Sequence, residues 1–234
     1  MEPDPARRRD ALAELAARVS SCTACERLVA WRNEAAAHPP AAFAHESYWA
    51  RPLPGFGDPA ARLVVVGLAP AAHGGNRTGR MFTGDRSGDF LVAGLHRHGF
   101  ANQPTSRGMD DGLQLLDAYL TAPVRCAPPG NRPLPEERRR CLPFLEEELA
   151  LLSSARVYLA LGAYAFESLG RLPALRGRLR GRFTHGGEYE LEPAATGPTV
   201  VLCSYHPSQR NVFTGLLTAE MFSAVLARAR QLLG

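Results

Sequence analysis

Apolar and polar positions along the chain form blocks that predict strands and helices in turn. Short apolar runs of strand length, each bounded by polar or turn-forming residues, occur at residues 63–66, 118–124, 157–161 and 199–203. Longer segments with a helical period lie between and around them, at residues 7–20, 87–98, 135–152, 163–169 and 218–233. Strands that alternate with helices favour a mostly parallel sheet covered on both faces, in one α/β domain spanning residues 1–234.

Two segments lack a clear period. Residues 33–60 are rich in alanine, proline, glycine and aromatic residues, which predicts an irregular connection packed over the core by its aromatic side chains. Residues 171–182 alternate arginine with small and apolar residues, so they form either a solvated turn or a patch that faces phosphates.

Three predicted strands end in unusual polar loops. The first loop is glycine-rich and runs from Gly67 to Asp89, the second follows Val124, and the third follows Cys203. Because the carboxyl ends of parallel strands share one edge of a sheet, these loops are expected to build one ligand site.

Composition narrows the chemistry. The 234-residue chain has a net charge of +4, which permits nucleic-acid binding without requiring it. All 27 basic residues are arginine, which excludes a side-chain Schiff base and a GxxxxGK[ST] phosphate loop. No apolar run reaches transmembrane length and the first residues do not resemble a secretory signal, so we expect a cytoplasmic protein without a membrane partner.

Four cysteines form two pairs, Cys22 with Cys25 and Cys126 with Cys141. Four soft thiolates suit zinc or an iron–sulfur cluster. The wide spacing fits a cluster better than a compact zinc ribbon, although zinc or four unrelated thiols stay possible. Cys203 lies in an apolar strand and is interpreted as a core residue.

Two long motifs then give a family resemblance. GLAPAAHGGNRTGRMFTGD (residues 67–85), SYHPSQRNVFTGLLT (residues 204–218) and the four cysteines, with VRCAPPGNRP around the third, resemble the family 5 (type B, iron–sulfur) branch of the uracil-DNA glycosylase superfamily. The resemblance spans residues 22–218. It implies a three-layer α/β/α sandwich with a four-stranded sheet and a structural [4Fe–4S] cluster on Cys22, Cys25, Cys126 and Cys141, with no nucleotide cofactor.

The activity implied is DNA repair, by a monomeric enzyme that works at the nucleoid. Such an enzyme flips a uracil out of DNA and removes it by hydrolysis, leaving an abasic site, and the lack of lysine agrees with a glycosylase that has no lyase activity. Phe82 matches the aromatic residue that stacks on the base, and His206 matches the histidine that contacts uracil O2. Backbone N–H groups between Ala71 and Gly75 are further donors to the base, which places Ala71, Ala72, His73 and Gly75 in the binding site.

The motif departs from better-known families at the residue that handles water. Ala69 stands where those families carry an acidic or polar side chain, and the family 5 resemblance moves this role to Asn76. An asparagine can orient water but cannot deprotonate it. Asp85 is the alternative candidate, unless it serves only as a turn or helix-cap residue.

Further residues are assigned to base selection and DNA contact. Ala122 stands where many superfamily members have an asparagine that reads uracil, which predicts tolerance of hypoxanthine and xanthine. The loop of Ser208, Gln209, Arg210 and Asn211 matches the one that fills the gap left by the flipped base. Arg77, Arg80 and Arg86 are expected to meet phosphates, or else to form structural ion pairs.

Two other functions remain open from the sequence. A phosphate-handling α/β hydrolase could use the glycine-rich loop, although the lack of lysine and of a carboxylate pair within residues 67–80 counts against it. A nucleic-acid-binding protein stapled by a metal, without catalysis, would need the basic surface but not Phe82 and His206 together.

Overall fold

A computed structural model describes residues 5–191 and 198–234, and within them six strands form one sheet in the order β1-β3-β2-β4-β6-β5. The strands are β1 (Phe56–Gly57), β2 (Leu63–Val66), β3 (Ala118–Thr121), β4 (Val157–Leu161), β5 (Glu188–Glu190) and β6 (Val200–Ser204). The helices are α1 (Pro5–Ser20), α2 (Glu26–Ala37), α3 (Gly75–Thr78), α4 (Arg86–Arg97), α5 (Pro135–Leu151), α6 (Ala163–Arg171), α7 (Gln209–Phe213) and α8 (Ala219–Leu233), with short 3-10 turns η1 (Ala41–Phe43) and η2 (Pro129–Asn131). None of the helices in these ranges is both long and apolar enough to cross a membrane.

The four central strands are parallel, as the sequence predicted. β2 lies between β3 and β4, and β6 pairs with the other side of β4. Every residue of these four strands is buried. Strands covered on both faces have continuous apolar runs, which is why the sequence pattern located them.

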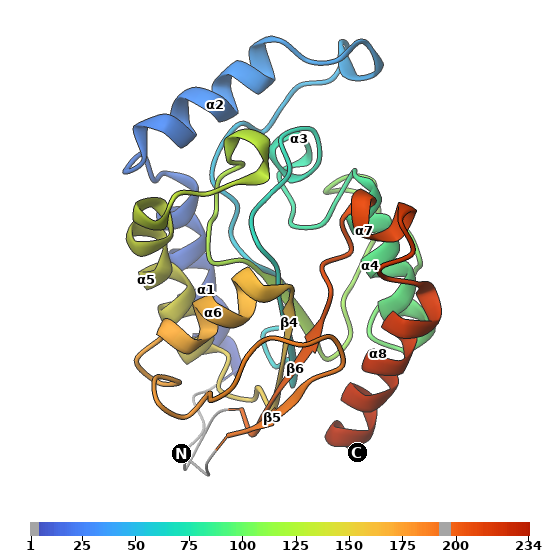
Figure 1. Ribbon diagram of the computed structural model, residues 1–234. Helices are drawn as coiled ribbons and strands as arrows, with labels where there is room; N and C mark the ends of the chain where they lie inside the picture. The colour runs from blue at the N-terminus through green and yellow to red at the C-terminus, as the bar shows by residue number, and fades with distance from the viewer. Residues whose placement is uncertain (1–4, 192–197) are drawn as a thin grey trace.

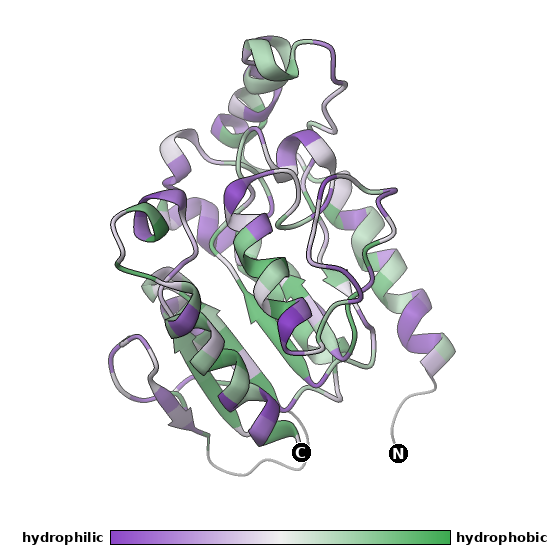
Figure 2. Ribbon diagram, turned by 90° about the vertical axis from the view of Figure 1, so that its right-hand side faces the viewer, coloured by the Kyte–Doolittle hydropathy of each residue, from purple (hydrophilic) through white to green (hydrophobic). Residues whose placement is uncertain are grey.

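Helices cover both faces of the sheet, which confirms the three-layer architecture (Figure 1). Leu63 and Val65 of β2 point toward the core beneath α4 and α8, whereas Val64 and Val66 point toward the core beneath α5 and α6. This alternation follows from the two-residue period of a strand. Figure 2 shows the central strands as a strongly hydrophobic part of the molecule.

The strand number requires a correction, because the described residues contain six strands rather than four. The two additional strands, β1 and β5, are antiparallel edges of the sheet. β1 has only 2 residues, and β5 is a Glu-Tyr-Glu segment of 3 residues that is partly exposed. Neither contains the apolar run by which the sequence analysis recognised strands.

A second correction concerns residues 33–60, which are not wholly irregular. Helix α2 extends into this segment, and η1 and β1 follow within it. The buried face of α2 consists of Leu28, Arg32 and Ala35. An arginine in the middle of that face hides its apolar period from sequence analysis. Helix α5 was predicted over residues 135–152, and it runs through Pro143 as a single helix.

Candidate active site

The segments that follow β2, β3 and β6 line one cavity of about 400 Å³, here called the base pocket. These strands run parallel within the sheet, so their carboxyl ends lie at the same edge, as predicted. The lining residues include Ala71, Phe82, Asp85 and Arg86 after β2, Ala122 and Asn131 after β3, and His206, Ser208 and Gln209 after β6.

Phe82 enters the base pocket from an unusual backbone conformation. Its φ is 50°, in the left-handed region, which costs a non-glycine residue about 1–3 kcal/mol. Glycine at position 67 makes room for the ring, since a Cβ there would lie 2.6 Å from Phe82 Cζ. The ring centroid lies 6.3 Å from that of His206, with 32° between the ring planes. The chain therefore presents a flat apolar surface beside the pocket histidine.

His206 is positioned by the start of α7. Its carbonyl accepts a hydrogen bond from Asn211 Nδ2 at 2.9 Å, and the Ser208 hydroxyl accepts one from the Asn211 N–H at 3.2 Å. Burial lowers the pKa of His206 to about 4, so its imidazole is neutral at neutral pH. Within the described residues its ring nitrogens make no hydrogen bond, which leaves one donor and one acceptor for a ligand.

The other predicted base-binding residues lie in the base pocket, in a neighbouring groove or in the protein interior. Ala71 and Ala122 line the base pocket, and the Ala122 side chain offers no hydrogen bond there. Ala72 and His73 line a neighbouring groove instead. Gly75 is buried, and a Cβ on it would lie 2.9 Å from Leu53 Cδ2. Only the Ala71 end of this segment therefore faces the base pocket.

Asn76 lies behind the pocket wall, which revises the role expected for it. Its side chain is 1% exposed and is absent from the lining of the base pocket and of the groove. Asn76 Nδ2 donates to the carbonyl of Arg32 at 3.1 Å and to that of Ala72 at 3.4 Å, while the buried Oδ1 has no partner. The short helix α3 turns this side chain toward α2, so Asn76 ties the loop to α2 and does not reach water in the pocket.

Two other polar side chains do reach the pocket. Asp85 is the N-cap of α4, where Oδ1 accepts the Gly88 N–H at 2.8 Å, and it also lines both cavities. Burial raises the pKa of Asp85 above its ordinary value, because desolvation outweighs the hydrogen bonds to this carboxylate. Asn131, in η2, lines the same two cavities. The sequence analysis did not select Asn131; its position in a polar loop after a buried strand was the available signal.

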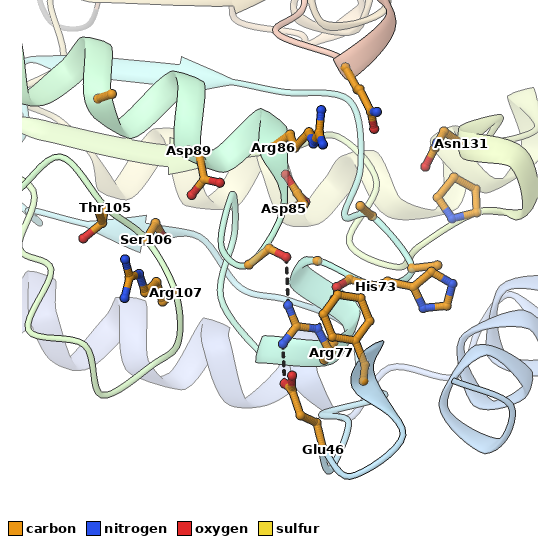
Figure 3. Close-up of a pocket in the computed structure, with 18 of the residues that line it drawn as sticks. Glu46, His73, Arg77, Asp85, Arg86, Asp89, Thr105, Ser106, Arg107 and Asn131 are labelled. Carbon is orange, nitrogen blue, oxygen red and sulfur yellow. Dashed lines mark hydrogen bonds and ion pairs between the residues drawn. The ribbon is translucent and has the colours of Figure 1, made fainter. Parts of the chain in front are cut away.

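A groove of about 1130 Å³ adjoins the base pocket (Figure 3). Ala71, Asp85, Arg86, Asn131 and Gln209 line both, so the two spaces are immediate neighbours. Aromatic side chains form part of the groove wall. The ring of His73 stacks against Phe43 with centroids 6.4 Å apart, and His73 Nδ1 lies 3.0 Å from the hydroxyl of Tyr48.

Arg77 faces inward, toward Glu46 and Phe43. Its guanidinium pairs with Glu46, donates to the Gly84 carbonyl at 2.8 Å and lies 4.0 Å from the Phe43 ring centroid (Figure 3). Only 9% of the side chain is exposed. Its donors therefore hold the loop together, which corresponds to the structural ion pair that the sequence analysis gave as the alternative.

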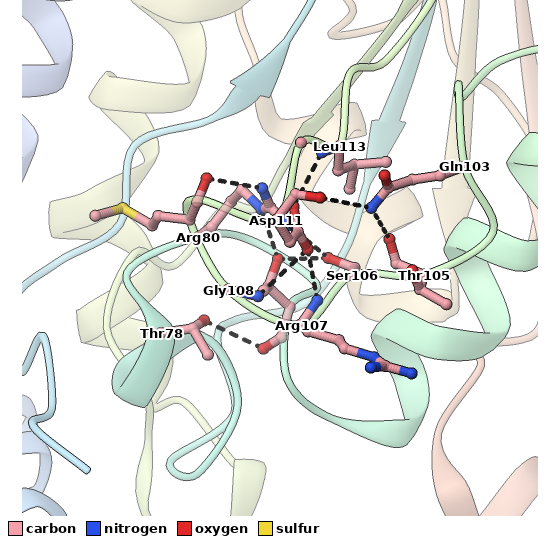
Figure 4. A network of polar contacts seen from close by, with 12 residues as sticks. Thr78, Arg80, Gln103, Thr105, Ser106, Arg107, Gly108, Asp111 and Leu113 are labelled. Carbon is pink, nitrogen blue, oxygen red and sulfur yellow. Dashed lines mark hydrogen bonds and ion pairs between the residues drawn. The ribbon is translucent and has the colours of Figure 1, made fainter.

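Arg80 is buried as well, with 5% of its side chain exposed. It pairs with Asp111 at 2.7 Å and donates to the hydroxyls of Thr83 at 2.9 Å and Ser106 at 3.1 Å (Figure 4). The expectation that Arg77 and Arg80 contact phosphates must therefore be revised. The partners Glu46 and Asp111 lie far away in sequence, so the motif alone did not reveal them.

The loop after His206 reaches the pocket only in part. Ser208 and Gln209 line the base pocket, whereas Arg210 is exposed and lines neither cavity. The Asn211 side chain is engaged by the His206 carbonyl. Ser208 and Gln209 are thus the members of this loop that line the base pocket.

All four cysteines expected to bind metal line one small, largely apolar cavity. Cys25 is the N-cap residue of α2, Cys126 follows β3, and Cys141 lies in α5. Two N–H groups point at the sulfurs: Arg32 Nη1 lies 3.2 Å from Cys126 Sγ, and the Arg125 main-chain N–H lies 3.3 Å from Cys141 Sγ. Across residues 5–191 and 198–234, however, no group of three or more His, Cys, Asp or Glu side chains is arranged to hold a single metal ion.

Comparison with known proteins agrees with this geometry. Residues 54–230 match the model of the Uracil DNA glycosylase superfamily. A Type-5 uracil-DNA glycosylase of Mycobacterium leprae is 50% identical over 222 residues, which cover 94% of this chain and 95% of that protein. One of Thermus thermophilus is 51% identical over 216 residues (92% and 95%), and a Type-4 uracil-DNA glycosylase of Pyrobaculum aerophilum is 32% identical over 162 residues (67% and 71%). The chain therefore belongs to the uracil-DNA glycosylase superfamily and, within it, to the type-5 branch.

Proposed function

We propose that this protein removes uracil from DNA by hydrolysis and that the base pocket is where the glycosidic bond breaks. The observation that carries the proposal is the convergence of Phe82 and His206 on one cavity from the loops after β2 and β6. Membership of the type-5 branch supports it, since the relatives are named for this activity.

In this proposal the flipped uracil stacks on Phe82 and its O2 accepts a hydrogen bond from His206. A cavity of about 400 Å³ is large enough for one base. As the bond between C1′ and N1 breaks, its electron pair passes to the base and negative charge grows on the base oxygens. The neutral imidazole of His206 can donate a hydrogen bond to that charge. One such fixed donor typically lowers the barrier by about 3 kcal/mol.

A water molecule supplies the hydroxyl that joins C1′. We assign the remaining proton of that water to Asp85. This carboxylate reaches the pocket, unlike Asn76, and its raised pKa brings it closer to that of an effective base at neutral pH. Capping of α4 engages Oδ1, and Oδ2 lies against the backbone of Gly74. The Asn131 amide lines the same cavity and can orient the water.

We also propose that Cys22, Cys25, Cys126 and Cys141 hold a [4Fe–4S] cluster. Their convergence on one cavity and the N–H donors from Arg32 and Arg125 fit thiolate ligands of a cluster. Burial raises the pKa of the Cys126 thiol to about 11 and that of Cys141 to about 12, so ligation must displace protons. When bound, the cluster would join α2, α5 and the segment after β3, and no step of the hydrolysis passes through it.

The proposed base range is wider than uracil. Ala122 contributes only a methyl group where an amide would read the uracil edge, so deaminated purines such as hypoxanthine and xanthine should also be accepted. Without lysine no side-chain amine attacks the sugar, so the abasic strand should stay intact. We further propose that the enzyme acts in the cytoplasm. It should act as a monomer, because one chain supplies the residues that line the pocket.

The direct test is incubation of the iron-loaded protein with a duplex that contains one uracil. Free uracil should appear in the supernatant, and the strand should break only after alkali. The same assay with inosine should release hypoxanthine. Binding of the duplex without base release would favour the non-catalytic binding protein, and strand cleavage before alkali would contradict the monofunctional mechanism.

A further inference from the structure

We propose that residues 102–113 form an arm that grips the DNA backbone through Arg107, and that the buried Arg80 is the strut that holds this arm in place. The inference rests on the proposed function in one respect: it takes the groove beside the base pocket as the path of the DNA strand.

The arm is closed at its base by main-chain pairing. Ala101 and Leu115 form an antiparallel bridge. One step further out, the Asn102 N–H donates to the Gln114 carbonyl at 3.0 Å, and the Gln114 N–H donates to Asn102 Oδ1 at 2.8 Å. These contacts bring the two ends of the segment together, so the residues between them project as one unit.

Asp111 fixes the far part of the arm (Figure 4). Asp111 Oδ2 accepts the N–H groups of Arg107 at 2.7 Å and Gly108 at 3.3 Å and pairs with Arg80 Nη2 at 2.7 Å. Asp111 Oδ1 accepts the Leu113 N–H at 3.0 Å. Burial alone would raise the pKa of Asp111, but these hydrogen bonds hold it well below its ordinary value, so the carboxylate that pairs with Arg80 stays charged.

A second set of bonds joins the arm to the glycine-rich loop. The hydroxyl of the fully buried Ser106 lies 2.7 Å from that of Thr83 and accepts from Arg80 Nη2 at 3.1 Å. The Ser106 carbonyl accepts the Gly84 N–H at 2.9 Å. Gly84 and Thr83 immediately precede Asp85, so the arm and the base pocket share one rigid support.

The guanidinium of Arg107 remains unpaired in this network. It is exposed, it lines the groove next to Thr105, and it has no hydrogen-bond or ion-pair partner among the described residues. Arg86 is likewise exposed, and its side chain has no such partner within residues 5–191 and 198–234. Arg77, the other arginine of the groove wall, is neutralised by Glu46. Arg107 and Arg86 are therefore the groove arginines that can bind an anion.

The placement of these two charges fits a nucleic-acid backbone. In the view of Figure 3, Arg107 and Thr105 lie on one side of Asp89, and Arg86 lies on the other. The Asp89 carboxylate, three residues after Arg86 in α4, repels a phosphate placed between the two arginines, so phosphates are directed to Arg107 and Arg86. Contacts of this kind position a duplex without reading its sequence, as a repair enzyme requires.

The test is the salt dependence of binding to a duplex that carries a tetrahydrofuran abasic-site analogue, measured by fluorescence anisotropy with the iron-loaded protein. Loss of one phosphate contact lowers the slope of log Kd against log salt by about one. The advantage of the wild type over Arg107→Gln should then shrink about three- to fourfold between about 50 and 200 mM salt. Arg107→Lys, which keeps the charge, should retain the wild-type slope.

Arg9→Gln is the matched control. Arg9 is exposed on α1 and lies against Asp58 and Pro59, which precede β2 and so lie at the opposite edge of the sheet from the base pocket. The Arg9→Gln substitution removes the same charge from the molecule as Arg107→Gln does. Equal slopes for Arg107→Gln and the wild type would overturn the proposal, as would an equal loss of slope in Arg9→Gln.

The role of Arg80 is tested by removing the charge of its partner with Asp111→Asn, in the wild type and in the Arg107→Gln variant. It should weaken DNA binding in the wild type but add little in the Arg107→Gln variant, because its effect passes through Arg107. A purely structural role would lower thermal stability and binding equally in both backgrounds, and that result would reject the strut. If the wild type binds DNA with the predicted slopes yet releases no uracil, the arm stands and the proposed activity fails.

Discussion

Phe82, whose backbone is in the left-handed region, places its aromatic ring at the wall of the base pocket. Gly67 and Gly88 leave room for the ring and the carbonyl of Phe82, and the ring lies beside His206. Neither side chain is needed to complete a hydrogen-bond network of the fold. At the scale of single residues, the two therefore have the character of binding groups.

Phe82→Ala should lower kcat/KM for uracil release about 5- to 150-fold, since a base stacked on an aromatic ring is worth about 1–3 kcal/mol. Phe82→Leu is the matched control, because it keeps apolar volume without a flat ring. Single-turnover kinetics on a uracil duplex would measure both. If leucine restores wild-type activity, Phe82 serves as packing and not as a stacking surface.

His206 also makes a prediction about stability. Its pKa is about 4 in the folded protein and about 6.5 in an unfolded chain, so between these values the unfolded state binds more protons. Stability from this group is thus fully present above pH ~6.5 and is lost as the pH falls toward ~4, by at most about 3 kcal/mol. Urea unfolding at several pH values should show this loss in the wild type and not in His206→Gln. An identical pH dependence in both proteins would contradict the buried, neutral imidazole.

At the scale of elements, α2 connects the cysteine cavity with the glycine-rich loop. Arg32 on this helix contacts Cys126 Sγ through its side chain and Asn76 through its carbonyl. Cys25 stands at the start of the same helix. The helix thus links the proposed cluster to the wall of the base pocket.

Asn76→Ala should therefore behave as a positioning variant. Loss of the bond to the Arg32 carbonyl should reduce the free energy of unfolding by about 1–2 kcal/mol and lower the rate of uracil release only moderately. Thermal unfolding and single-turnover rates of the same preparation would measure both effects. A rate loss of about 100-fold or more with unchanged stability would return the water-orienting role to Asn76.

The sequence predicted elements better than side-chain directions. The parallel strands were found because both of their faces are buried, and Phe82 and His206 were found through motifs. α2 was missed because Arg32 interrupts its buried face, and β1 and β5 were missed because short edges need no apolar run. Arg80 was assigned to DNA because its partner Asp111 lies outside the motif, and ion pairing over such a separation cannot be read from local sequence.

At the scale of the whole molecule, the cysteine cavity brings together parts of the chain that are distant in sequence. Cys22 follows α1, Cys126 follows the central strand β3, and Cys141 lies in α5. A group bound to all four cysteines would join the end of α1, the start of α2 and α5 to the loop that contains Asn131.

Loss of the proposed cluster should loosen α2 before it unfolds the sheet. Cys141→Ser should lower the iron content and visible absorbance, and amide hydrogen exchange should rise first within residues 26–37. Cys203→Ser is the control, because Cys203 lies in β6 and not at the cysteine cavity. Full iron content in Cys141→Ser, or unchanged exchange in α2, would contradict this assignment.

The most direct test of the central claim is the single-turnover rate of uracil release by His206→Ala, with DNA binding measured on the same preparation. If the base pocket is the active site and His206 its donor, the rate should fall about 100-fold or more while the Kd for the duplex changes little. A wild-type rate in this variant would contradict the proposed site.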